Sequence, residues 1–184
     1  MVEFRRLALD GLVEIRPRRF ADERGFFSET WNDAEWRDAG IAIHFVQDNH
    51  SLSKARGTLR GLHFQAPPAA QAKLVRVTRG SAFDVAVDLR PASPTYRQWA
   101  GVTLSADAWN QLLIPEGFAH GFLTLEPDTE VQYKASVAYS PAHDRAVRFD
   151  DPAIAVDWPL PAAELVLSDR DRAAPLLALV ETGF

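Results

Sequence analysis

Residues 81–89 alternate strictly between bulky apolar residues and residues that are small or acidic. A period of two places successive side chains on opposite faces, so this segment predicts a β-strand whose faces meet different surroundings. One face carries Phe83, Val85, Val87 and Leu89, and the other carries Ala82, Asp84, Ala86 and Asp88.

Shorter segments of the same kind surround this strand. Residues 73–77 alternate as well, with Lys73 on their apolar face. Many short strands with regularly spaced turns predict an all-β sandwich or jelly-roll barrel, and such barrels hold ligands in their mouths. Further strands are predicted at residues 111–115 and 130–134, and turns at residues 90–95 and 115–117.

Few helices are expected around this barrel. Asn32 can cap a helix over residues 33–39, because its side chain accepts hydrogen bonds from free amides, and Gly40 can end that helix. A second helix is predicted over about residues 175–180, after a loop and cap at residues 168–171. Both helices would lie at the periphery.

The composition narrows the class of protein. The 184 residues, 47% hydrophobic and 24% charged, suffice for one core, and no repeat or linker divides them, so we expect a single domain over residues 1–184. The absence of cysteine excludes thiolate chemistry and suits a reducing cytoplasm. No signal peptide or membrane-spanning run is found. A net charge of −5 argues against nucleic-acid binding but allows a local phosphate site.

His63 is the first candidate for chemistry. A single histidine among apolar residues is commonly a core residue, but Arg60 lies only three positions earlier, across Gly61. In a regular strand this offset would send the two side chains to opposite faces. We therefore predict a bulge at the glycine that brings both into one pocket.

A metal site must also be considered, because residues 114–122 contain Pro-x-Gly-x-x-His, the second half of a cupin signature. The first half of that signature would supply a second histidine and a glutamate near His63. Gln65 stands in place of the histidine, and alanines occupy positions 69 and 70, where the glutamate would fall. A metal needs three or four ligands, and only His63 and His120 remain, so we expect no metal.

Three more polar residues each have two interpretations. Lys73 is either an edge lysine or an interior ammonium that pairs with Asp84 and stabilises an oxyanion. Tyr133 is either core packing or a proton donor. Asp171, in a segment typical of a capping loop, can also orient His63 and raise its basicity.

A series of motifs resembles the dTDP-4-dehydrorhamnose 3,5-epimerase family over nearly the whole chain. Each motif alone is weak, but their order makes the resemblance specific. The principal motifs lie at residues 22–29, 47–51, 59–65, 73–77, 84–90, 114–122, 133–134, 139–141, 150–152, 158–159 and 168–171.

The resemblance implies a cofactor-free, cupin-like jelly-roll barrel with a few short peripheral helices, and a homodimer with exchanged strands. It also implies an isomerase that inverts C3 and C5 of a dTDP-sugar. The substrate would be dTDP-4-dehydro-6-deoxy-D-glucose and the product dTDP-4-dehydro-L-rhamnose, in dTDP-L-rhamnose biosynthesis.

The same resemblance implies roles for particular residues. His63 would be the general base, oriented by Asp171, with Tyr133 as the acid on the opposite face and Lys73 stabilising the enolate. Tyr139 would stack on thymine. The substrate ligands would be Arg24, Glu29, Gln47, Asn49, Arg60, His120, Tyr139, Asp144 and Arg170.

Some positions depart from the family pattern, and three further functions stay open. Asp144 stands where glutamate is usual, and Arg170 where lysine is common. A 3-only or 5-only epimerase would share these motifs. The second hypothesis is a metal-dependent cupin oxygenase or isomerase, and the third is a non-catalytic sugar-binding cupin.

Overall fold

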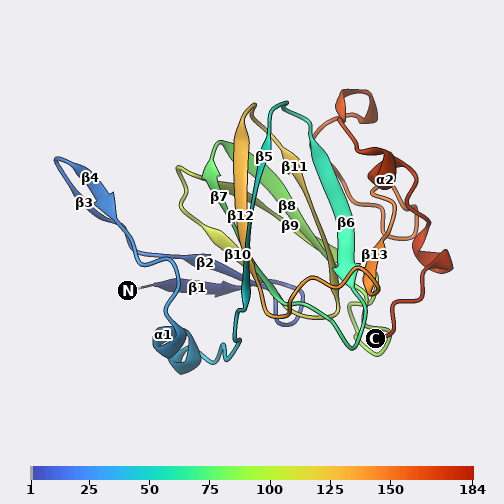
Figure 1. Ribbon diagram of the computed structural model, residues 1–184, viewed down its shortest axis with the longest axis horizontal. Helices are drawn as coiled ribbons and strands as arrows, with labels where there is room; N and C mark the ends of the chain where they lie inside the picture. Colours follow the sequence, from blue (N-terminus) through green and yellow to red (C-terminus); the bar gives the residue numbers. More distant parts are fainter. Residues whose placement is uncertain (1) are drawn as a thin grey trace.

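The computed structural model describes residues 2–184 and consists of two antiparallel sheets packed face to face, with a two-stranded hairpin outside them (Figure 1). The strands are β1 (Glu3–Arg6), β2 (Val13–Arg16), β3 (Phe20–Asp22), β4 (Gly25–Phe27), β5 (Gln47–Ser53), β6 (Leu59–Gln65), β7 (Lys73–Arg79), β8 (Ser81–Asp88), β9 (Trp99–Ser105), β10 (Gln111–Ile114), β11 (Phe118–Thr124), β12 (Thr129–Ala135) and β13 (Asp144–Ala146). The helices are α1 (Asp33–Asp38) and α2 (Asp169–Arg172), with single 3₁₀ turns η1 (Ala162–Glu164) and η2 (Leu177–Leu179). The predicted all-β class is confirmed.

The two large sheets divide the strands between them. One has the order β1-β2-β10-β7-β12-β5, and the other has the order β13-β6-β11-β8-β9. Strands β7 and β8 are neighbours in sequence but lie in different sheets, so their side chains face each other across the barrel only where both point inward. Strand β5 is an edge strand of the first sheet.

Both faces of β8 are buried, against different partners. Ala82 and Ala86 belong to the cluster between the sheets, together with Val75 from β7. Val85 and Val87 belong to a second cluster on the outer side of the five-stranded sheet. The alternation therefore separates a face of small and acidic residues, which points into the barrel, from a bulky face that points out of it.

The C-terminal segment covers that outer face. Ile154 and Leu177 are buried in the outer cluster, and Trp158 and Phe184 pack against it. In Figure 1 this segment runs as an orange-to-red chain along the outside of β6 and β13. These apolar side chains attach the segment to the sheet, although it contains little regular secondary structure.

The predicted bulge at Gly61 is confirmed. Arg60 pairs with Phe122 and His63 pairs with His120, so β6 has one more residue than β11 between these two pairs. Gly61 has φ +138°, a conformation that L side chains rarely adopt. The extra residue turns Arg60 and His63 toward the same cavity.

The first helix prediction is confirmed and the second is wrong. Asn32 caps α1, accepting from the amides of Ala34 at 3.0 Å and Glu35 at 3.3 Å. Residues 175–180 form only the 3₁₀ turn η2. Their backbone groups bond to the loop after β13 instead: Leu177 donates to the Asp151 carboxylate and the Pro175 carbonyl accepts from the Arg148 amide.

The hairpin of β3 and β4 projects away from the barrel, at the left of Figure 1. Phe20, Phe26 and Phe27 on this arm are exposed, Phe27 by 70%. Phe20 and Phe27 are paired across the two strands, and an exposed apolar patch of this kind is typical of a protein contact surface. Within the described part of the chain, no helix has the length and apolar character needed to cross a membrane.

We predict that Gly61→Ala destabilises the fold more than Gly25→Ala does. A Cβ at Gly61 would lie 2.4 Å from the Gly121 Cα, whereas one at Gly25 would meet nothing within 4 Å. Gly25 has φ +133°, so both variants incur a similar backbone cost and only Gly61→Ala adds the collision. The free energy of unfolding should fall by about 2 kcal/mol more in Gly61→Ala, measured by urea denaturation. Equal losses would contradict this close approach.

Candidate active site

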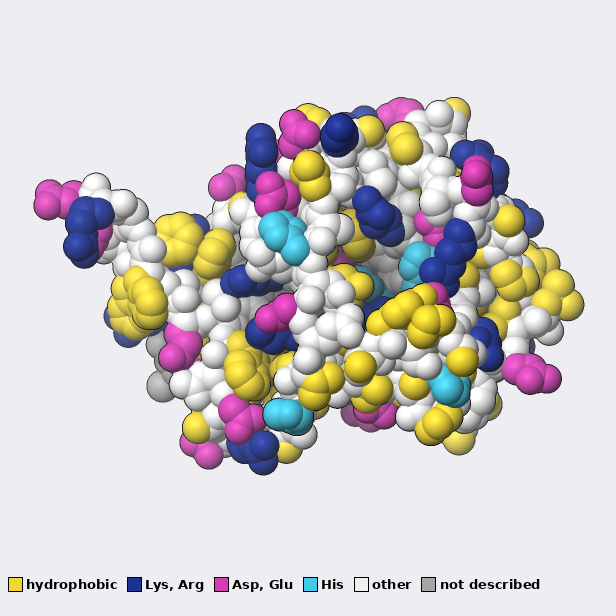
Figure 2. All heavy atoms as spheres, viewed as in Figure 1, with side chains coloured by type: hydrophobic (Ala, Val, Ile, Leu, Met, Phe, Trp, Pro, Cys, Tyr) yellow, Lys and Arg dark blue, Asp and Glu magenta, His cyan; other side chains and the backbone are white. Residues whose placement is uncertain are grey.

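A cavity of about 610 Å³ opens at the mouth of the barrel between the two sheets and α2. Figure 2 shows the hollow on the viewed face, with histidine, basic and acidic side chains gathered around it. Most of the residues predicted for the site lie here. They are Arg60, His63, Lys73, His120, Tyr133, Tyr139, Asp144, Arg170 and Asp171.

Four predicted ligands do not line this cavity. Arg24 lies at the turn of the projecting arm, where it pairs with Asp22, and Glu29 accepts from Asn32 at 3.0 Å. Gln47 and Asn49 lie on β5 and bond to each other at 3.0 Å. The Gln47 side chain also accepts from the Tyr139 amide at 2.9 Å, so it borders the cavity indirectly.

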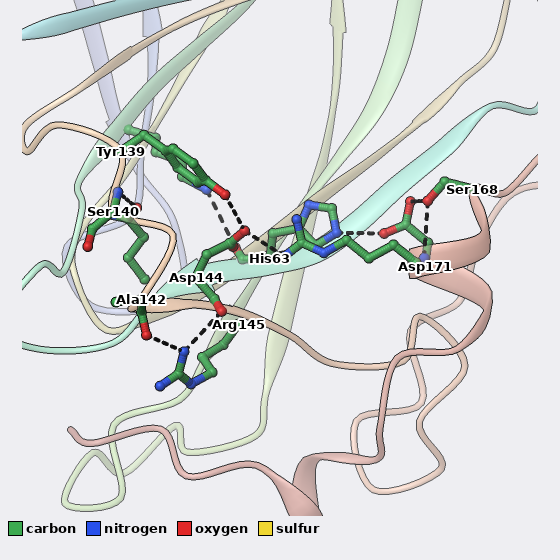
Figure 3. A network of polar contacts seen from close by, with 11 residues as sticks. His63, Tyr139, Ser140, Ala142, Asp144, Arg145, Ser168 and Asp171 are labelled. Atoms are coloured by element: carbon green, nitrogen blue, oxygen red, sulfur yellow. Dashed lines mark hydrogen bonds and ion pairs between the residues drawn. The ribbon is translucent and has the colours of Figure 1, made fainter.

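His63 and Asp171 form a short hydrogen-bonded pair in the cavity (Figure 3). The His63 Nε2 lies 2.6 Å from the Asp171 Oδ1, and Asp171 is only 4% exposed. Burial opposes ionisation of Asp171, but hydrogen bonds from His63 and Ser168 outweigh it and lower the carboxyl pKa. With Nε2–H donating to Asp171, the other ring nitrogen, Nδ1, keeps its lone pair and can act as a base.

Asp171 is brought to His63 by a segment distant in sequence. Ser168 caps α2, and its hydroxyl donates to the Asp171 Oδ2 at 2.7 Å. Upstream, Val166 forms a parallel bridge with Thr58, directly before β6. The segment that carries Asp171 is therefore tied to the strand that carries His63.

Lys73 lies between the walls of the cavity. Its Nζ is 3.5 Å from the His63 carbonyl oxygen and 5.9 Å from the centre of the Tyr133 ring. Burial lowers the pKa of Lys73 to about 8, although the charges of Asp84 and Asp144 partly oppose this. The ammonium is therefore charged at neutral pH and poorly solvated, as an oxyanion-stabilising group should be.

The predicted pairing of Lys73 with Asp84 is wrong. Asp84 binds His120 instead, with its carboxylate oxygens 3.0 and 3.1 Å from the His120 Nε2. The reason is topological, because β8 pairs with β11 in one sheet while Lys73 lies on β7 in the other. Asp84 acts on Lys73 only through its charge.

Tyr133 faces the cavity from the six-stranded sheet, whereas His63 belongs to the five-stranded sheet. Burial raises the pKa of Tyr133, the charge of Asp144 adds to this, and Arg60 partly opposes it. The phenol therefore keeps its proton at neutral pH. Arg60 is held in place by Ser53, whose hydroxyl accepts from the guanidinium at 3.2 Å.

Glutamine side chains support the cavity wall, a role that the sequence interpretation missed. Gln65, where a metal ligand was considered, is 4% exposed; it donates to the Ala69 carbonyl at 2.7 Å and accepts from the Ser140 amide at 2.6 Å. Gln71 donates to the Val137 carbonyl at 2.6 Å. A buried glutamine within an apolar strand is a signal for such backbone bracing, since its amide must find partners.

Asp144 joins two more of the predicted ligands (Figure 3). Its carboxylate accepts from the Tyr139 hydroxyl at 3.0 Å and pairs with Arg170 at 2.8 Å.

Among residues 2–184, no three His, Cys, Asp or Glu side chains come together as a metal site would require.

Together these groups can move a proton next to a carbonyl. His63 provides a basic nitrogen, Lys73 a cation for developing negative charge on oxygen, and Tyr133 a proton from the opposite sheet. A C–H beside a ketone becomes acidic only when its enolate oxygen is stabilised. The arrangement is suited to enolisation and reprotonation.

Comparisons with known proteins agree with this chemistry. The family model described as dTDP-4-dehydrorhamnose 3,5-epimerase matches residues 6–178. A dTDP-4-dehydrorhamnose 3,5-epimerase of Sinorhizobium fredii is 48% identical over 181 residues, covering 98% of this chain and 92% of the relative.

Two solved structures have closely similar folds. The Bacillus anthracis dTDP-4-dehydrorhamnose 3,5-epimerase with TDP and PPi bound has a TM-score of 0.93 and 47% identity, covering 96% of this chain and 100% of that one. The Legionella pneumophila dTDP-6-deoxy-D-glucose-3,5-epimerase in complex with dTDP-4-keto-L-rhamnose has a TM-score of 0.94 and 43% identity, covering 98% and 95%. The predicted cupin-like jelly roll is confirmed by this likeness.

The pKa of Lys73 is already lowered to about 8 in the wild type. We predict that it is lower still in the Asp84→Asn variant. The Asp84 anion favours the charged ammonium, so its neutralisation leaves burial less opposed. Selective ¹³Cε labelling of lysine followed by an NMR titration measures this pKa. Asp48→Asn is the control, because Asp48 pairs with Lys134 rather than acting on Lys73, and should leave the value unchanged. A Lys73 pKa that rises or stays constant in Asp84→Asn would contradict the assigned electrostatics.

Proposed function

The chain belongs to the dTDP-4-dehydrorhamnose 3,5-epimerase family, and we propose that its barrel cavity inverts both C3 and C5 of the substrate without a cofactor. As an enzyme of this family it is an isomerase that converts dTDP-4-dehydro-6-deoxy-D-glucose to dTDP-4-dehydro-L-rhamnose. The proposal adds the roles of this chain's own residues. The observation that carries it is the pair of proton-transfer groups on opposite sheets, with Lys73 between them.

In the proposed reaction, His63 Nδ1 takes the proton from the carbon next to the C4 ketone. The C–H electron pair forms the enolate, whose negative charge moves to the ketone oxygen and is stabilised by Lys73. Asp171 stabilises the imidazolium that results, since it already accepts the Nε2 proton at 2.6 Å.

Tyr133 then donates its proton to the opposite face of the same carbon, and the enolate electrons return to form the new C–H bond. The raised pKa of Tyr133 supports this role, because the phenol stays protonated until the carbanion takes its proton. His63 loses its proton to water and Tyr133 regains one before the second carbon reacts. Each inversion therefore brings one solvent proton into the sugar.

Two features at the surface of the chain bear on its assembly: the edge strand β5 and the exposed aromatic arm formed by β3 and β4. We propose that the chain forms a homodimer in which the arm of one protomer reaches the cavity of its partner. This explains why Arg24 and Glu29 lie away from their own cavity. We also propose that residues 1–184 act as one domain in the cytoplasm, as the composition predicts.

The reaction is tested by NMR of the substrate with enzyme in D₂O. We expect deuterium at both C3 and C5, and its loss at both carbons in His63→Ala. His50→Ala is the matched control, because His50 also pairs with a carboxylate, Glu130, at 2.9 Å, and its side chain does not line the cavity. Tyr133→Phe should slow inversion more than proton abstraction.

Different labelling patterns would indicate a different function. Deuterium at one carbon only would indicate a 3-only or 5-only epimerase, and deuterium at neither would reject the proposed reaction. Retained exchange in His63→Ala would remove His63 as the base. A stoichiometric metal whose removal stops exchange would favour a metal-dependent cupin.

Arm exchange is tested by combining two impaired chains. Arg24→Ala damages the arm and His63→Ala damages the cavity, and differently tagged chains allow the mixed dimer to be isolated after co-expression. If the arm serves the partner's cavity, the mixed dimer has one site with both groups intact and regains roughly half the wild-type rate. If the arm served its own cavity, both sites would be damaged and no activity would return.

A further inference from the structure

We propose that Asp144 is a positioning residue that ties the Tyr139 wall of the cavity to the helix that carries Asp171. The proposal rests on the proposed function for its effect on turnover, but its structural part can be measured without substrate. Asp144 lies on β13, the edge strand that pairs with β6, opposite Gln65. From there its carboxylate reaches two separate segments.

The carboxylate binds one side chain from each of two segments that line the cavity, Tyr139 (Figure 3) and Arg170. The Tyr139 hydroxyl donates to Oδ2 at 3.0 Å, and the Arg170 Nη2 lies 2.8 Å from the same oxygen. The Asp144 side chain is only 14% exposed, whereas that of Arg170 is 50% exposed. A partly desolvated carboxylate holds a guanidinium more firmly than an exposed one does.

The electrostatics agree with a fixed, ionised Asp144. Burial would raise its pKa, but the hydrogen bonds from Arg170 and Tyr139 outweigh burial and lower it. The charge of Asp144 also acts on Lys73 and Tyr133, whose pKa values it raises. One carboxylate thus influences groups on both sides of the site.

On the Tyr139 side, the backbone and the ring are held separately. Gln47 and Gln65 fix the backbone, by accepting from the amides of Tyr139 and Ser140. The Tyr139 residue is nevertheless 55% exposed, so little packing restrains its ring. The hydrogen bond from the Tyr139 hydroxyl to Asp144 therefore sets the orientation of the ring.

On the opposite side of the mouth, Arg170 directly precedes Asp171 in α2. This helix has four residues, too few to be stable by its own hydrogen bonds. Ser168 holds Asp171 from the N-terminal cap of the helix, and the Arg170–Asp144 pair holds the helix from across the mouth. Loss of that pair should loosen Asp171 and, through it, the orientation of His63.

Two substitutions separate the two contacts of Asp144. Asp144→Asn keeps a carbonyl oxygen for Tyr139 but loses the charge that holds Arg170, so we expect kcat to fall about tenfold. Tyr139→Phe keeps the ring but loses the hydroxyl, so we expect KM to rise about fivefold with a smaller change in kcat. Asp144→Ala should combine both effects.

A substrate-free measurement tests the structural part. Amide hydrogen exchange of residues 166–173, followed by mass spectrometry, should be faster in Asp144→Asn than in the wild type. Asp150→Asn is the matched control, because it breaks an exposed Asp–Arg pair with Arg148, also at 2.8 Å, outside the cavity. It should leave exchange in residues 166–173 and both kinetic constants unchanged.

A pair of substitutions that conserves the length of the Asp144–Arg170 ion pair provides a rescue test. Glutamate is one methylene longer than aspartate, and lysine reaches less far than arginine, so Asp144→Glu with Arg170→Lys conserves the span of the pair. The double variant should recover at least part of the kcat lost by Arg170→Lys alone.

Two results would overturn the inference. One is an unchanged rate of amide exchange in Asp144→Asn. The second is a double variant, Asp144→Glu with Arg170→Lys, whose loss of kcat is the sum of the two single losses, with no rescue. If the wild type fails to turn over the substrate but Asp144→Asn still loosens residues 166–173, the proposed function fails and the positioning role stands.

Discussion

The close approach of β6 and β11 at Gly61 and Gly121 organises the mouth of the barrel. A Cβ on Gly61 would lie 2.4 Å from the Gly121 Cα, so the two backbones meet with no room for a side chain. The bulge at this contact gives β6 its extra residue and turns Arg60 and His63 to one cavity. It also sets His63 opposite His120 on β11.

The outer face of β8 contributes to the position of Asp171 beside His63. Its bulky residues need a cover, and the C-terminal segment supplies it through side chains such as Ile154 and Leu177. That segment has little regular structure, so its path is set by the barrel surface that it covers. Asp171 reaches His63 because the C-terminal segment passes the mouth of the barrel.

Three basic side chains that line the cavity are each held by a carboxylate, but Lys73 has no such partner. Asp171 holds His63, Asp84 holds His120 and Asp144 holds Arg170. Among the ion pairs of residues 2–184, none includes Lys73, and burial lowers its pKa to about 8. A cation without a carboxylate partner in a sheltered cavity is suited to an anion that forms during reaction, such as an enolate.

Local features of this protein follow from its sequence alone: the alternating strands, the bulge at Gly61, the Asn32 cap and the types of residue available for proton transfer. They arise from backbone conformation and side-chain period, which act over a few residues. Tertiary packing, by contrast, selected the face of β8 that points inward, gave Asp84 to His120 rather than to Lys73, and left residues 175–180 without an α-helix. It also separated Arg24 from the cavity and joined Tyr139 to Arg170 through Asp144. These outcomes depend on sheet order and on contacts between distant segments, which no local pattern encodes.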